Sequence, residues 1–262
     1  MSRTRAALWA LLALMALRIP AALVMNALLP DAAEAPLAFY LATIAQELVM
    51  FGLPALLLRP WRSERMQAAR RSWRWLAVAA AAALMARAAL TPLTDWWVAL
   101  TEAEEALLPQ PGSVWETVLQ VLALAIVPAL AEEAFFRGAL LTALMDGCRR
   151  STAILLSTLM FSLMHGSLAG LPAHMSIGFV LTLLMLRSGR IIVPVTAHAL
   201  YNALALCWPV LPGRVGAVCG VLLAILVCAM FPLLQRERPR MGRVDALLAF
   251  LSLAGMTAFY LL

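Results

Sequence analysis

Long apolar runs alternate with short polar segments along the whole 262-residue chain. A membrane-spanning helix needs about 20 consecutive apolar residues, and the runs predict up to nine such helices. Because the sixth run is short, we expect eight or nine complete crossings. The predicted spans cover residues 6–29, 36–58, 75–93, 113–145, 151–165, 171–186, 191–208, 214–234 and 244–262. The pattern therefore predicts an all-α protein: a polytopic transmembrane helix bundle that forms one integral membrane domain over residues 1–262.

The fourth run, residues 113–145, is too long for a straight crossing. At 1.5 Å per residue it would measure about 50 Å, whereas the hydrocarbon core is about 30 Å thick. The helix must tilt, protrude or break. Pro128 removes a backbone hydrogen bond from the run, so we expect any break there.

Composition and charge agree with this prediction. The chain is 64% apolar and 13% charged, whereas soluble domains are about 45–50% apolar and 25% charged. All twenty basic residues are arginine, and sixteen of them lie at the N-terminus or in alternate loops. This is the positive-inside pattern of a membrane protein with a cytoplasmic N-terminus, not the basic patch of a nucleic-acid-binding protein. With its alanine and leucine richness, it indicates a bacterial inner-membrane protein.

Some ionisable and polar residues fall inside the apolar runs, where topology does not explain them. A charge at the bilayer centre costs about 3 kcal/mol on insertion scales, so each needs a partner or a function. They are Arg18, Glu47, Arg87, Glu132, Glu133, Arg137, His165, His174, His198 and Asn202.

Three of these residues lie in the sequence PALAEEAFFRG, residues 128–138. Glu133 and Arg137 are four residues apart and share one helix face, so we interpret them as a structural ion pair. Glu132 points about 100° away from Glu133 and is left without a fixed cation. A buried carboxylate of that kind suits a general base.

His165, His198 and Asn202 each have an ordinary structural explanation as interfacial or interhelical polar residues. Their depth argues for a common role. Measured from the nearest arginine turn, His198 lies about 12 Å deep along its helix, and Glu132 and His165 lie about 21 Å deep. A glutamate, two histidines and an asparagine can supply a base, a proton carrier and oxyanion donors. We therefore predict a polar site buried at mid-membrane.

The order of three short motifs, EEAFFR, FSLMH and HALYN, resembles that of the CAAX protease and bacteriocin-processing (CPBP, Abi) family of intramembrane proteases, also called type II CAAX endopeptidases. The resemblance covers about residues 114–206. It implies an intramembrane endopeptidase that hydrolyses a peptide bond in a membrane-associated peptide or protein tail. It implies the following roles: Glu132 activates water with the help of His165, His198 and Asn202 stabilise the oxyanion, and Glu133, Arg137 and Phe161 shape the site. His174 matches no motif position and is expected at the outer end of the sixth span.

Relatives of this kind are often described as metalloproteases, so a zinc ion is an alternative. A catalytic zinc needs three protein ligands and a water, which Glu132, His165 and His198 would supply. Glu133 would then have to act as the base while paired with Arg137. We therefore favour a metal-independent glutamate mechanism with no cofactor.

Two other functions use the same residues. A proton-coupled transporter needs further ionisable groups along a path through the membrane, and only Glu47 and Arg87 are left to line one. A non-catalytic scaffold would retain the cluster for packing, and Glu132→Ala would then impair folding.

Overall fold

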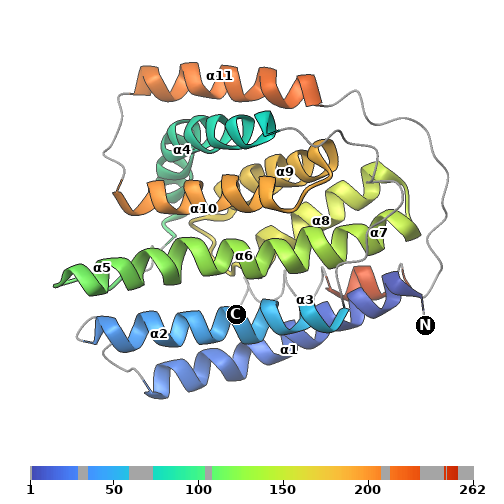
Figure 1. Ribbon diagram of the computed structural model, residues 1–262, viewed down its shortest axis with the longest axis horizontal. Coiled ribbons are helices and arrows are strands. Elements are labelled where there is room, and N and C mark those ends of the chain that lie inside the picture. Colours follow the sequence, from blue (N-terminus) through green and yellow to red (C-terminus); the bar gives the residue numbers. More distant parts are fainter. Residues whose placement is uncertain are drawn as a thin grey trace.

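The computed structural model describes residues 2–28, 35–58, 73–103, 108–207, 213–230, 245 and 247–252, and no strand occurs within them. The all-α prediction is confirmed (Figure 1). The α-helices are α1 (Arg3–Leu28), α2 (Pro36–Glu47), α3 (Leu53–Leu58), α4 (Arg74–Thr101), α5 (Val114–Val121), α6 (Val127–Glu133), α7 (Leu141–Gly147), α8 (Arg150–Met164), α9 (Leu171–Ser188), α10 (Ile192–Cys207) and α11 (Gly213–Met230). Three π-helical segments join some of them: η2 (Leu48–Gly52), η4 (Leu122–Ile126) and η5 (Ala134–Leu140).

Five helices in the described part of the chain are long and apolar enough to cross a membrane: Thr4–Met25, Pro36–Leu58, Arg74–Thr101, Val114–Gly147 and Leu171–Ser188. Shorter apolar helices cover Arg150–Met164, Ile192–Cys207 and Arg214–Met230. These elements coincide with the first eight predicted spans, so the protein is a polytopic membrane bundle. The ninth predicted span and the arginine-rich segments 59–72 and 231–244 lie wholly or largely outside the described residues.

Two predicted boundaries were wrong. The third span was expected to end at residue 93, but α4 continues through Pro92 to Thr101. The expected break at Pro128 does not occur, since Val114–Gly147 is one continuous helix. Pro128 lies two residues after the end of the π-helical turn η4, and a wider turn there accommodates a residue that lacks an N–H group.

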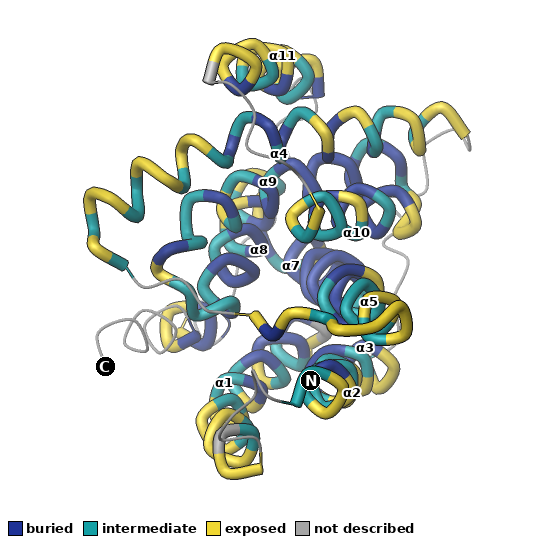
Figure 2. Tube along the Cα trace, turned by 90° about the vertical axis from the view of Figure 1, so that its left-hand side faces the viewer, coloured by how far each residue is buried: buried dark blue, intermediate teal, exposed yellow. Residues whose placement is uncertain are grey.

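The continuous helix α5–α7 occupies the centre of the bundle (Figure 1). Helices α1, α2 and α3 pack on one side of it, and α8, α9 and α10 pack on the other. Helix α4 covers α9 and α10, and α11 is outermost on α4. The end-on view shows buried residues around α7 to α10 and exposed ones on the outer faces of α1 and α11 (Figure 2). Most exposed side chains on α11 are apolar, for example Val218, Val221 and Ile225, as expected of a lipid-facing helix.

Candidate active site

The central helix carries both adjacent glutamates near its middle. Glu132 and Glu133 end α6, between the π-helical segments η4 and η5. Their side chains are buried, with 6% and 0% of their surface exposed. Segments of π-helix occur frequently at functional sites, and here they flank two carboxyl groups whose burial is energetically costly.

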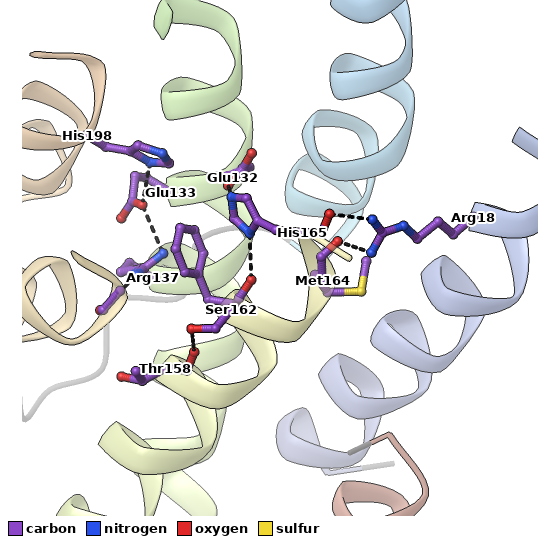
Figure 3. A network of polar contacts seen from close by, with 11 residues as sticks. Arg18, Glu132, Glu133, Arg137, Thr158, Ser162, Met164, His165 and His198 are labelled. Carbon is purple, nitrogen blue, oxygen red and sulfur yellow. Dashed lines mark hydrogen bonds and ion pairs between the residues drawn. The ribbon is translucent and has the colours of Figure 1, made fainter. Parts of the chain in front are cut away.

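Glu133 is the centre of a buried ionic network (Figure 3). Its Oε1 atom accepts a hydrogen bond from Arg137 Nη1 at 2.9 Å and another from His198 Nδ1 at 3.0 Å. The expected pair between Glu133 and Arg137 is therefore present, although Arg137 lies on the π-helical segment η5. The sequence did not reveal that Glu133 also holds His198.

Arg137 is fully enclosed, with 0% exposure. Its Nη2 atom donates to the carbonyl oxygen of Gly178 on α9 at 2.9 Å. Its guanidinium lies 4.1 Å from the centroid of the Phe161 ring, close enough for a cation–π interaction. Phe161 thus closes one side of the ion pair, and its other edge meets the rings of His165 and His198, at centroid distances of 4.7 and 5.7 Å.

His165 ends α8 and faces Glu132 (Figure 3). Gly166 follows it with a φ of 63°, the left-handed conformation that terminates many helices. The Nδ1 atom of His165 donates to the carbonyl oxygen of Phe161 at 2.8 Å, because a carbonyl can only accept. The Nε2 atom is therefore unprotonated in the neutral ring, and it lies 3.6 Å from Glu132 Oε2.

Glu132 and His165 both line a cavity of about 170 Å³. The Oε2 atom of Glu132 is buried and makes no hydrogen bond to another described residue. Its position agrees with the prediction that Glu133, and not Glu132, is tied to Arg137. The cavity is lined by Arg18, Gln46, Glu47, Met50, Phe51, Glu132, Phe136, Met164 and His165.

Two site residues were missed because their partners lie on other helices. Arg18 on α1 donates from Nη2 to the carbonyl oxygen of His165 at 2.6 Å and from Nη1 to that of Met164. Glu47 ends α2 and reaches the same cavity. Both were visible in the sequence as charges within apolar runs, but no spacing relates residue 18 or 47 to residue 132.

His174 was expected at one end of its helix, away from the site. It does lie in the first turn of α9, but its ring stacks on that of His165, with centroids 4.0 Å apart and planes at 28°. Asn202 is half-buried on α10, one helical turn beyond His198. It makes no hydrogen bond within the described part of the chain, so no hydrogen bond joins it to the other site residues.

The side chains as placed do not form a zinc site. No group of three or more His, Cys, Asp or Glu side chains converges as ligands among the described residues. Glu132 approaches His165, whereas His198 is turned toward Glu133. We therefore derive no step through a metal.

Residues 114–204 match the family model described as type II CAAX prenyl endopeptidase, Rce1-like. Over this segment the chain is similar to the CAAX protease family. The matched segment contains all seven motif residues to which we assigned a role: Glu132, Glu133, Arg137, Phe161, His165, His198 and Asn202. It does not contain Arg18 or Glu47. The match supports an integral membrane protein with peptidase activity. No curated protein and no solved structure matches the chain.

Proposed function

We propose that the protein is an intramembrane endopeptidase that uses Glu132 to activate water, without a metal. One observation carries the proposal: Glu132 Oε2 and His165 Nε2 face each other at 3.6 Å on the wall of a cavity. An ionised carboxylate and an unprotonated ring nitrogen both only accept hydrogen bonds. A water between them donates one hydrogen bond to each, which leaves its lone pairs directed at a substrate carbonyl.

The reaction follows from these positions. The water oxygen attacks the carbonyl carbon of the scissile peptide bond, and Glu132 takes the proton that the water loses. His165 keeps the water oriented, since its own ring is fixed by the hydrogen bond to Phe161. The C–N bond then breaks, and the leaving amine takes up a proton.

Charge develops on the carbonyl oxygen during the attack, and His198 is the residue best placed to stabilise it. Glu133 holds its ring in place through Nδ1, so that the opposite edge of the ring can face the oxyanion. Asn202, one turn further along the same helix, supplies the second donor.

Substrates are peptide bonds close to a membrane segment or a lipid-modified tail. Glu132 is the nineteenth residue of the 34-residue helix Val114–Gly147, about 27 Å from its start at 1.5 Å per residue. We therefore place the site at mid-membrane. Water and substrate would meet there away from bulk solvent.

A matched pair of variants tests the role of Glu132. Wild type, Glu132→Gln and Glu116→Gln are purified in detergent and given an internally quenched peptide that carries a farnesylated cysteine in a C-terminal CAAX sequence. General-base catalysis contributes about 10²–10⁴-fold, so Glu132→Gln should lower the cleavage rate by that factor without changing the melting temperature. Glu116 lies outside the cavity, where it accepts a hydrogen bond from the backbone of Gly112, and its variant should cleave normally. Equal cleavage by all three would refute the mechanism, and an unfolded Glu132→Gln would favour the scaffold function.

Metal analysis of the same preparations tests the metal-independent part of the proposal. We expect substoichiometric zinc in wild type and full activity after treatment with a chelator. One zinc per protein that is lost in His165→Ala would overturn it.

A further inference from the structure

The cavity contains a second carboxyl group that the mechanism above does not use. Glu47 comes from α2 and Glu132 from α6, and both line the same cavity. The Oε2 atom of each is buried and has no hydrogen-bond partner among the described residues.

Among the described residues that line the cavity, the positive charge is that of one guanidinium. Arg18 is the one arginine among the residues that line the cavity, and it keeps its proton at any relevant pH. Of the other charged groups nearby, Arg137 is paired with Glu133 behind the ring of Phe161. His198 is bound to the same Glu133 oxygen.

The histidines add no second cation to the cavity. The Nδ1–H of His165 is bound to the Phe161 carbonyl oxygen, and its ring stacks on that of His174. Two stacked imidazoles cannot both be protonated without mutual repulsion. If both glutamates were ionised, the cavity would carry one uncompensated negative charge, which is costly away from water. Two like carboxylates that share a site ionise one at a time.

We propose, resting on the endopeptidase function above, that Glu47 is a further catalytic residue: it shares a single proton with Glu132 and delivers that proton to the leaving amine. In the resting state the two carboxyl groups hold one proton between them, and the reactive form has Glu132 ionised and Glu47 protonated. The attacking water gives a proton to Glu132, and the amide nitrogen takes the proton of Glu47 as the C–N bond breaks. Glu132 is then protonated and Glu47 ionised, and transfer of one proton between them restores the reactive form.

Labelling with dicyclohexylcarbodiimide, which attacks only protonated carboxyl groups, tests the shared proton without any substrate. Wild type, Glu47→Gln, Glu132→Gln and the control Glu116→Gln are labelled at pH 7, and the modified glutamates are located by mass spectrometry. We expect about one label per wild-type molecule, divided between Glu47 and Glu132. In each single variant the remaining carboxylate is balanced by Arg18, so its labelling should fall at least several-fold. Unchanged labelling of the remaining glutamate would overturn the shared proton.

Cleavage of the farnesylated peptide tests the acid role. Glu47→Gln should lower kcat by about 10²–10³-fold, as expected for loss of a general acid, with KM little changed. The wild-type rate should fall at both low and high pH, because the base must be ionised and the acid protonated. The fall at high pH should disappear in Glu47→Gln. A Glu47→Gln protein with the wild-type rate and pH profile would overturn the acid role. A wild type that cleaves no peptide would instead contradict the proposed endopeptidase function, and the labelling result would not be affected.

Discussion

The ion pair that holds His198 depends on a residue without a side chain. Gly178 on α9 accepts the hydrogen bond of Arg137 Nη2 through its carbonyl oxygen. A Cβ atom at this position would lie 2.8 Å from Phe161 Cδ1 and 3.6 Å from Arg137 Nη2. The space that a methyl group needs is therefore already occupied by the ring that covers the guanidinium.

We predict that Gly178→Ala destabilises the protein. An alanine in a helix interior is ordinarily favoured over glycine by about 1 kcal/mol, but overpacking a full core costs about 1–3 kcal/mol. The clash should win, because neither Phe161 nor Arg137 can move without breaking other contacts. Thermal melting in detergent measures the effect. Gly220→Ala on α11 is the control, since its Cβ would only touch Ala89 Cβ at 3.7 Å. A Gly178→Ala protein at least as stable as the control would contradict the prediction.

Spacing within one helix predicted the contacts of single residues well, and contacts between helices poorly. The interval of four between Glu133 and Arg137 was sufficient to predict their pairing, which the structure has. The stacking of His174 on His165 joins α9 to the end of α8, and no pattern in either helix indicates it. The same applies to Arg18, whose partners are 146 and 147 residues away.

At the scale of elements, the π-helical segments were not predictable. Segments η2, η4 and η5 lie within continuous apolar helices, where periodicity does not distinguish a turn of π-helix from one of α-helix. From Pro128 we expected a break in the helix. The helix instead forms a wider π-helical turn just before Pro128 and then continues. Two of these segments adjoin an acidic residue of the cavity or the ion pair: η2 follows Glu47, and η5 follows Glu133.

Helix α1 also contributes to the site, by holding the end of α8. Arg18 donates to the carbonyl oxygens of Met164 and His165, two of the groups that a helix C-terminus leaves without a helical partner. It lies on a helix that is outside the matched segment 114–204. A positive charge near a helix C-terminus is favourable as well.

We predict that Arg18→Met weakens both catalysis and stability. The loss of hydrogen bonds from a charged group should cost about 1–3 kcal/mol of stability, while His165 loses the anchor that keeps Nε2 opposite Glu132. We expect kcat for the farnesylated peptide to fall at least about tenfold, with KM little changed; tenfold corresponds to about 1.4 kcal/mol. Arg5→Met on the same helix is the control, because Arg5 forms a partly exposed pair with Asp245 at 3.2 Å. Equal kcat values for the two variants would rule out a role of Arg18 in positioning His165.

At the scale of the whole molecule, hydropathy predicted the order of the helices because each must satisfy its own backbone in lipid. Their arrangement around α5–α7 was not predictable, since apolar faces of similar composition can pack in many ways. The side on which each loop lies stays a prediction from the arginine pattern. The structure adds a geometric constraint to it: at 34 residues, the helix Val114–Gly147 is about 51 Å long.

That length exceeds the roughly 40–45 Å of a bilayer with its headgroups, so the two ends of the helix must reach water on opposite faces. Gln110 precedes the helix, Arg149 follows it, and both are exposed. In a variant whose four native cysteines are replaced by alanine, we expect a membrane-impermeant maleimide to label Gln110→Cys in intact cells and Arg149→Cys only after permeabilisation. The direction follows from the positive-inside rule, which places the Arg149–Arg150 turn in the cytoplasm. Labelling of both cysteines from one side would show that the central helix does not span the membrane, and labelling of Arg149→Cys alone would invert the topology.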